Sequence, residues 1–476
     1  MTDTLAILGG DPLRTKPFIV EPMIDDDEER LVLQAIRDRN FSRYIGIAVG
    51  EDVLTMPSAE ADRLGDYWHF LGGPNVRAFA AEFAAVLDVP YAIPITSATV
   101  GLGVALAAAG VGPGDEVIVP ALSFSATANA ILMFNSIPVF VDVDRDTFCI
   151  DPSKIEAAIT PRTRAILAVH LTGNIADMDA IMAIARKHDL VVVEDAAQAI
   201  GGSWNGRKTG TLGHAGVFSF QQSKNIMTGE GGMIVTSDPQ IAKRARLILN
   251  HGELVFGDDA TIDDLANVVG LNFRLPELCA ALGRAQLKKL DFVNQWRTRN
   301  ADVLREELQG IPGITLPPSQ HLSGGVAVDI PHFFVALYDA AAAGMSRDLF
   351  VTALREEGIP IGTGYSRPMY AAPTFRKRIA YGRDGYPWNQ GDSVNPTQYP
   401  AGLCPVAEDL LAEKFLWLYH IAYSSTVEDM KEVAAAIRKV MANRDALVEA
   451  EPRLANKLGV HSAGRIGVAP QHLKKG

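Results

Sequence analysis

The chain has 476 residues, more than one hydrophobic core usually supports, so a large domain with a smaller companion is expected. Its 44 Lys and Arg against 56 Asp and Glu give a net charge of -12 without a long basic run, which argues against nucleic-acid binding. The three cysteines, Cys149, Cys279 and Cys404, lack a CxxC spacing; this argues against a disulfide framework or a metal site and favours a cytoplasmic protein.

The first segments of the chain predict a helix and a long connection. Residues 1–4 contain an acid and no basic region, so no secretory signal is expected. Acidic residues followed by apolar residues at helical spacing predict an amphipathic helix over 25–37. Residues 43–68 are rich in turn-forming residues and show no clear period, so we expect an inserted loop or arm there.

From residue 76 onward, short apolar runs alternate with helical runs. Helices are predicted at 76–87, 152–159 and 176–188, and strands at 117–121, 138–143, 164–170 and 190–195. This alternation predicts right-handed crossovers and a mostly parallel sheet covered on both faces, the α/β fold class. The uncharged run 117–141 is long enough to span a membrane, but its prolines and polar residues favour strand, turn, helix and strand, so no membrane span is expected.

The remainder of the chain predicts the end of a large domain over 1–290 and a smaller α+β domain with a tail over 291–476. Strands at 216–220 and 233–237 and a helix at 239–249 belong to the large domain. The smaller domain follows a long helical connector at 276–309, with amphipathic helices at 346–358 and 427–441 and a polar helical extension from about 442.

One acid and one lysine stand out as chemical candidates. Asp195 ends the strand run VVVED, at the edge of the sheet where open α/β folds bind ligands, although an isolated acid there more often caps the next helix. Lys224 follows a strand and precedes the glycine-rich turn 229–232, whereas a single lysine is usually a solvated surface charge. A lysine that condenses with an aldehyde needs a phosphate site and an acid nearby, and both are available.

These residues lie in stretches that resemble a known family. EDAAQAIGG (194–202) and FSFQQSKNIMTGEGG (218–232), with Lys224 placed 29 residues after Asp195, are similar to the DegT/DnrJ/StrS family of sugar aminotransferases. The similarity extends to 97–131 and 270–287. It implies a fold-type I pyridoxal-phosphate transferase and a homodimer with shared active sites.

The resemblance also implies a role for each candidate residue. Lys224 would hold pyridoxal 5'-phosphate as a Schiff base and later move a proton, and Asp195 would pair with the pyridinium nitrogen. The resemblance further implies that Ala98, Thr99, Val100 and Ser219 contact the phosphate of the cofactor, and that Asn272 reaches the phosphate in the partner subunit. Phe124 would stack on the ring face, and Gln198 would contact the phenolic oxygen. Without the resemblance, the turn at 97–100 is only a good helix start and Phe124 a core residue.

Other features resemble one subgroup. Residues 5–18 and 338–360, with Gln221 where many members have His, are similar to enzymes that aminate inosose cyclitols or make aminohydroxybenzoate. We therefore expect amino transfer from glutamine or glutamate to a keto-cyclitol or ketosugar in secondary-metabolite or aminosugar biosynthesis. Three alternatives stay open: an aminotransferase for a nucleotide-linked ketosugar, a dehydratase, whose relatives replace the lysine by histidine, and a non-catalytic cofactor-binding regulator. Residues 43–68 and the aromatic segment 365–388 could frame the substrate or simply pack.

Overall fold

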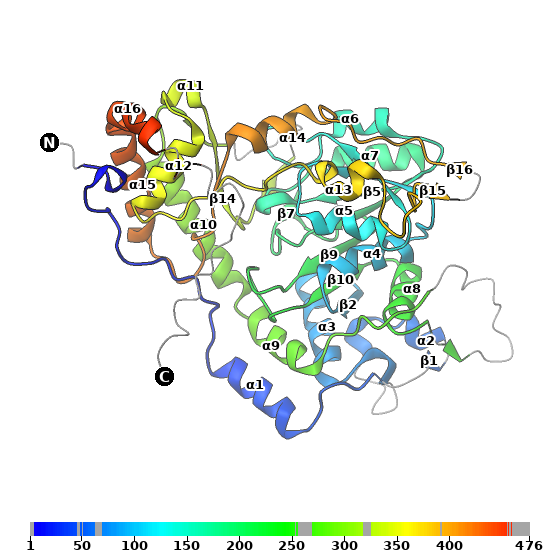
Figure 1. The fold of residues 1–476 in the computed structure, drawn as a ribbon. Coiled ribbons are helices and arrows are strands. Elements are labelled where there is room, and N and C mark those ends of the chain that lie inside the picture. The colour runs from blue at the N-terminus through cyan, green and yellow to red at the C-terminus, as the bar shows by residue number, and fades with distance from the viewer. Residues whose placement is uncertain are drawn as a thin grey trace.

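A seven-stranded sheet forms the centre of the molecule (Figure 1). The computed structural model describes residues 4–44, 48–49, 51–61, 69–252, 254–255, 269–317, 325–390, 393–454, 456 and 458. The strand order is β2-β10-β9-β6-β5-β3-β4, and within this sheet β10 alone runs antiparallel to its neighbours, so the predicted mostly parallel sheet is confirmed. The strands are β2 (Tyr91–Ile95), β3 (Glu116–Pro120), β4 (Ile137–Val141), β5 (Thr163–Val169), β6 (Val191–Asp195), β9 (Ala215–Ser219) and β10 (Gly232–Thr236).

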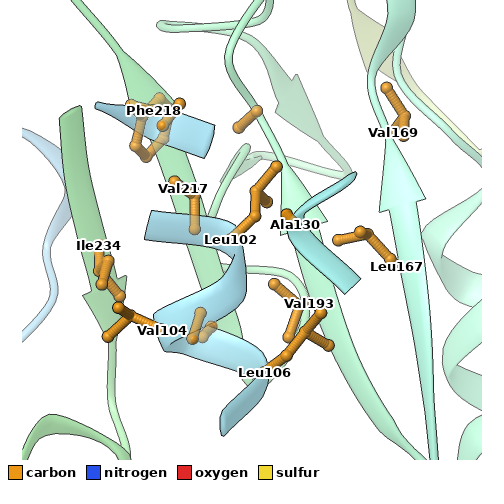
Figure 2. Packing of buried hydrophobic residues seen from close by; sticks show 14 of the residues in the cluster. Leu102, Val104, Leu106, Ala130, Leu167, Val169, Val193, Val217, Phe218 and Ile234 are labelled. Atoms are coloured by element: carbon orange, nitrogen blue, oxygen red, sulfur yellow. The ribbon is translucent and has the colours of Figure 1, made fainter. Parts of the chain in front are cut away.

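Helices cover both faces of this sheet. Along β3, Val117 and Val119 belong to one buried cluster and Ile118 to another, and this alternation separates the two faces. In Figure 2 the leucines and valine of α4 lie against side chains from β5, β6, β9 and β10. The helices of this part are α3 (Pro74–Leu87), α4 (Ala98–Ala108), α5 (Ser125–Leu132), α6 (Pro152–Ile155), α7 (Met178–His188) and α8 (Pro239–Leu249).

The long uncharged run at 117–141 forms β3, α5 and β4, as predicted from its prolines and polar residues. The two strands are buried in the sheet, and α5 contributes buried side chains such as Ala128, Ile131 and Leu132 to the core beside it. Among the residues that the structure describes, no helix combines the length and the apolar character needed to cross a bilayer.

The segment predicted as a loop at 43–68 contains some regular structure where it is described. Strand β1 (Ala48–Val49) pairs with β11 (Leu254–Val255), and helix α2 (Glu51–Leu54) follows. The guanidinium of Arg246 donates to the carbonyls of Val53 and Leu54, which fixes this helix against α8. Residues 45–47, 50 and 62–68 of the predicted loop lie outside the described residues.

The expected connector at 276–309 is two helices, α9 (Glu277–Leu287) and α10 (Leu290–Glu307). Leu290 and Val293 of α10 pack in the sheet core, whereas Ala301 and Leu304 pack in a second core. Helix α10 therefore joins the two bodies rather than belonging to one of them (Figure 1). The second core is built on β12 (Ile314–Thr315), β14 (Phe334–Tyr338) and β17 (Phe415–Leu418) with helices α12 (Arg347–Glu356), α15 (Val427–Ala442) and α16 (Arg444–Leu454).

The N-terminal residues pack on the second core and not on the sheet. Leu5 and Ile7 are buried among its side chains, so this end departs from the expected large domain over 1–290. The buried carboxylate of Glu357 accepts the amides of Ala6 and Leu13 at 2.8 Å each, and Arg14 pairs with Asp429 at 2.7 Å. These bonds give the short N-terminal segment a fixed path that apolar contact alone does not specify.

Helix α1 (Asp26–Arg37) follows this segment and lies against α9. Asp25 and Glu28 form a reciprocal cap at its first turn, the arrangement typical of a helix start. The remaining short elements are β7 (Ser203–Trp204), β8 (Arg207–Lys208), β13 (Ala327–Val328), α11 (Ala340–Ala343), α13 (Pro373–Lys377), β15 (Asn389–Gln390), β16 (Ser393–Val394) and α14 (Pro405–Asp409).

Candidate active site

The candidate residues gather where the parallel strands end. Ser97 follows β2, Phe124 follows β3, Asp195 is the last residue of β6, and Lys224 lies in the turn after β9. Because these four strands run in the same direction, their carboxyl ends share one edge of the sheet. The fold thus brings together residues that the sequence places up to 127 positions apart (97 to 224).

Asp195 is a buried carboxylate at this edge. Its Oδ2 accepts the hydroxyl of Thr127 at 2.8 Å, and its Oδ1 accepts the amide of Ala197 at 3.2 Å. Burial raises the pKa of Asp195, whereas these hydrogen bonds and the charge of Lys224 lower it. A cation placed against this carboxylate would therefore be strongly favoured.

A second carboxylate supports the strand end that carries Asp195. Glu194 is fully buried and accepts the amides of Gly210, Leu212 and Gly213 at 2.6–2.7 Å. Its Oε2 also lies 2.9 Å from Nε2 of His170. Because Nδ1 of His170 accepts the amide of Ala176, Nε2 carries the proton that reaches Glu194.

Lys224 has the character of a reactive amine. The burial of its side chain, opposed by Asp195 and reinforced by Arg297, lowers the pKa of Lys224 to about 8. Within the described ranges its Nζ makes no hydrogen bond or ion pair. An unprotonated, unpaired amine at a sheet edge is suited to attack a carbonyl carbon.

The start of α4 lies at the same edge of the sheet, directly after β2. Ser97 caps the helix, and its hydroxyl accepts the Val100 amide at 3.4 Å. A side chain at Gly232 would lie 2.7 Å from the Ala98 nitrogen, so the glycine lets the start of β10 approach the start of α4. The first amides of a helix favour an anion, and Thr99 is only partly buried there. Ser219, the last residue of β9, is half-buried at the same edge.

Phe124 and Gln198 border an aromatic residue that sequence reasoning did not single out. Phe124 is 57 % exposed, so it is not the core residue that an isolated phenylalanine suggests. Its ring lies 6.3 Å from the ring of Tyr365, and Gln198 Nε2 donates to the Tyr365 hydroxyl at 3.2 Å. The amide of Thr172 donates to Gln198 Oε1 at 2.7 Å, which fixes the orientation of the glutamine.

Tyr365 is the first residue of the aromatic segment 365–388, and the rest of that segment packs elsewhere. Tyr370 and Phe375 lie 5.8 and 5.2 Å from the ring of Phe140 on β4, and Trp388 is buried against Tyr399. The aromatic segment thus places Tyr365 beside Phe124 and Gln198, whereas Tyr370, Phe375 and Trp388 pack in the core.

Asn272 lies on the surface near this edge. Its Oδ1 accepts Nε of Arg274 at 2.9 Å, and the neighbouring carbonyl of Phe273 accepts the amide of Thr96. No hydrogen bond among the described residues links Asn272 to Lys224 or Asp195. The candidate set thus divides into a cluster around Lys224 and one exposed amide side chain.

Comparison with known proteins identifies the family. Residues 59–438 match the DegT/DnrJ/EryC1/StrS aminotransferase family, and the chain belongs to it. It is similar to L-glutamine:2-deoxy-scyllo-inosose aminotransferase of Streptomyces fradiae, with 35% identity over 93% of this chain and 98% of the relative. The chain is therefore a pyridoxal-phosphate-dependent aminotransferase, and the resemblance seen in its sequence is confirmed.

Solved structures agree with this assignment. DesI, crystallised in the presence of its TDP-sugar product, is 28% identical to this chain with a TM-score of 0.74. The match covers 94% of this chain and 99% of the DesI chain. The 3-amino-5-hydroxybenzoic acid synthase has 28% identity, a TM-score of 0.70, and covers 90% of this chain and 100% of its own. The expected fold of pyridoxal-phosphate transferases is confirmed.

Proposed function

We propose that this aminotransferase moves an amino group from L-glutamine or glutamate to the ketone of a keto-cyclitol in secondary-metabolite biosynthesis. The observation that carries the proposal is similarity over nearly the whole length to an enzyme named for glutamine and 2-deoxy-scyllo-inosose. A relative that matched only the sheet would support the cofactor chemistry alone. Here the match also covers the C-terminal body, whose Trp417 lies 5.1 Å from the ring of Tyr365.

The residues at the sheet edge fit pyridoxal phosphate. Lys224 would hold the aldehyde carbon of the cofactor. The phosphate would bind at the start of α4, at Ala98, Thr99 and Val100, with Ser219 beside it. Phe124 and Gln198 would contact the ring. The Phe124 ring is half-exposed, and the buried Asp195 carboxylate accepts hydrogen bonds from neutral donors only. A cationic aromatic ring would stack on the first and pair with the second. When bound, the cofactor supplies an electron sink that stabilises a carbanion next to the transferred nitrogen.

Two charged side chains would do most of the chemistry of the protein itself. Asp195 would keep a proton on the ring nitrogen opposite it, because separation of that proton would leave an unpaired buried carboxylate. The lowered pKa of Lys224 leaves about a tenth of the amine uncharged at pH 7, and this form would take and return the proton of the substrate carbon.

Tyr365 would face the substrate. Its oxygen accepts Gln198 Nε2, so its own proton is directed to another acceptor, and a hydroxyl of a polyol or its ketone oxygen would serve. Burial raises the pKa of Tyr365 to about 12, and the phenol therefore stays a donor at all ordinary pH values. Trp417, 5.1 Å from the Tyr365 ring, would limit the space on that side.

We also infer a homodimer with shared active sites in the cytoplasm. Support comes from Asn272, which is exposed and, among the described residues, forms no hydrogen bond with Lys224 or Asp195 of its own chain, as a residue serving the neighbouring subunit would. All three cysteines are free thiols, two of them buried, as expected in a reducing compartment.

A spectroscopic half-reaction tests the proposal. The purified protein, loaded with pyridoxal phosphate, is mixed with L-glutamine or with glutamate, and the absorbance of the bound cofactor should convert to that of the pyridoxamine form. Addition of scyllo-inosose or its 2-deoxy derivative should reverse the change and yield an amine. Lys224→Ala should abolish the conversion; a variant that converts as readily as the wild type contradicts the assigned role of Lys224.

One second candidate has a specific observation in its favour. DesI is structurally similar over nearly the whole chain and was crystallised with a TDP-sugar product. Nucleotide-linked ketosugars should therefore be assayed in parallel with the cyclitols. Turnover of only the nucleotide-linked ketone would replace the keto-cyclitol by that substrate class.

A further inference from the structure

A hydrogen bond from the C-terminal body holds the residue that precedes Lys224. The hydroxyl of Tyr419, which follows β17, donates to the carbonyl of Ser223 at 2.8 Å. Among the residues that the structure describes, no backbone amide donates to this carbonyl, because Ser223 lies in the turn after β9. The peptide unit before the lysine is therefore positioned by a residue almost 200 positions further along the chain (419 minus 223).

The second side of the lysine is held by two buried side chains. Asn225 Nδ2 donates to Oδ1 of Asn294 at 2.8 Å, and Asn225 Oδ1 lies 3.2 Å from Nδ1 of His332. Burial, together with the positive charges of Lys224 and Arg297, lowers the pKa of His332 well below its usual range. The imidazole is therefore neutral and donates to the asparagine.

Arg297 of α10 joins these two supports. It is 3 % exposed, its Nη1 donates to the carbonyl of His332 at 2.8 Å, and its guanidinium carbon lies 5.6 Å from the ring centroid of Tyr419. No carboxylate in the described part of the chain forms an ion pair with it. A buried cation that is not paired with a carboxylate lowers the pKa of the basic groups near it, here Lys224 and His332.

The titratable groups around Lys224 come from β6, α10 and the segment before β14. Asp195 on β6 is the anion; Arg297 on α10 and His332, before β14, are the basic groups. Burial is the main cause of the lowered pKa of Lys224, and Arg297 acts in the same direction against Asp195.

We propose that Arg297 is a positioning residue for Lys224: from α10 it braces His332 and Tyr419, which hold the residues on both sides of the lysine, and it sets a fixed positive charge behind the amine. The inference rests on the proposed role of Lys224. It assigns to α10 and the C-terminal body the task of holding the lysine in place and of favouring its uncharged form.

The test measures the amine without the cofactor. In cofactor-free protein, the rate at which acetic anhydride labels Lys224 is followed by peptide mass spectrometry over a pH series. The wild type should show a midpoint near pH 8. Arg297→Met should raise the midpoint by about one unit or more, so that labelling at pH 8 falls about fivefold. Arg299→Met is the matched control, because Arg299 lies on the same helix, is exposed, and covers Trp296 instead.

A second variant separates position from charge. Tyr419→Phe keeps the ring beneath Arg297 and removes the bond to Ser223. It should leave the midpoint unchanged but slow the attachment of pyridoxal phosphate, followed by absorbance, about two- to tenfold, the effect of one hydrogen bond. If Arg297→Met does not fold, the rate of cofactor attachment in Tyr419→Phe tests the inference by itself.

Three outcomes overturn the inference: an unchanged midpoint in Arg297→Met, an equal shift in Arg299→Met, or wild-type attachment in Tyr419→Phe. Borohydride reduction of the loaded protein followed by peptide mapping checks the premise separately. Attachment of the cofactor to another lysine refutes the proposed function, whereas a normal attachment at Lys224 with an unchanged midpoint refutes only the role of Arg297.

Discussion

Replacement of Glu194 by glutamine should destabilise the protein because its side chain has four donors and no acceptor around it. The carboxylate accepts two amides at Oε1 and an amide plus His170 at Oε2. A glutamine can present its oxygen to one of these pairs only, and its NH₂ group then faces two donors. His170 cannot relieve this by exchanging its proton, since its Nδ1 must accept the amide of Ala176.

The size of the effect follows from the two lost bonds. Hydrogen bonds to a charged group are worth about 1.5–3 kcal/mol each, so Glu194→Gln should cost about 3–6 kcal/mol. With an unfolding entropy of about 2.1 cal/mol/K per residue, a chain of this length loses about 3–6 °C in Tm.

Thermal unfolding of the cofactor-free protein at a fixed scan rate measures this change. The matched control is Glu156→Gln, because Glu156 is exposed and pairs with the surface groups Lys187 and His188. Its Tm should change by less than about 1 °C. A Tm within 1 °C of wild type for Glu194→Gln would refute the view that four converging donors require a charged acceptor.

Further outcomes are expected for the active site. The rate of cofactor attachment to the cofactor-free enzyme should rise with pH through about 8, because the uncharged form of Lys224 is the reactive one; a rise near the ordinary lysine value contradicts this. Tyr365→Phe should raise KM for the keto substrate about tenfold while the half-reaction with glutamine changes less, and equal losses in both would remove Tyr365 from the acceptor side. A mixture of inactive Lys224→Ala and Asn272→Ala subunits, refolded together, should regain about a quarter of wild-type activity, since half of the dimers would contain one intact site; no recovery contradicts shared sites.

The sequence predicted six of the seven strands of the central sheet, because their apolar runs are local patterns, whereas β2 (Tyr91–Ile95) was not predicted. The period of apolar residues located β6 and therefore Asp195, and the turn chemistry after β9 located Lys224. Long-range packing was not predictable in this way. Arg297, His332 and Tyr419 lie in separate segments, and nothing in their local patterns indicates that they meet behind the lysine.

Tyr365 and the N-terminal segment illustrate two further limits. The aromatic composition of 365–388 indicated a special segment, but only the fold separates Tyr365 from rings that pack on β4. Leu5 and Ile7 read as an ordinary start of the large domain, whereas Glu357, far along the chain, determines where they pack. The residues next to Glu357 in the sequence give no sign that its carboxylate accepts two amides from the N-terminal segment.

The attachment of the N-terminal segment to Glu357 and Asp429 has a consequence for the order of synthesis. Residues 5–14 leave the ribosome well before their partners, which are synthesised 344 to 415 residues later. At about 5–20 residues per second, the buried Leu5 and Ile7 wait roughly 20 to 80 seconds for the surface that covers them. This early segment thus folds late, and each newly made chain carries uncovered apolar side chains until the residues around Glu357 and Asp429 have been synthesised.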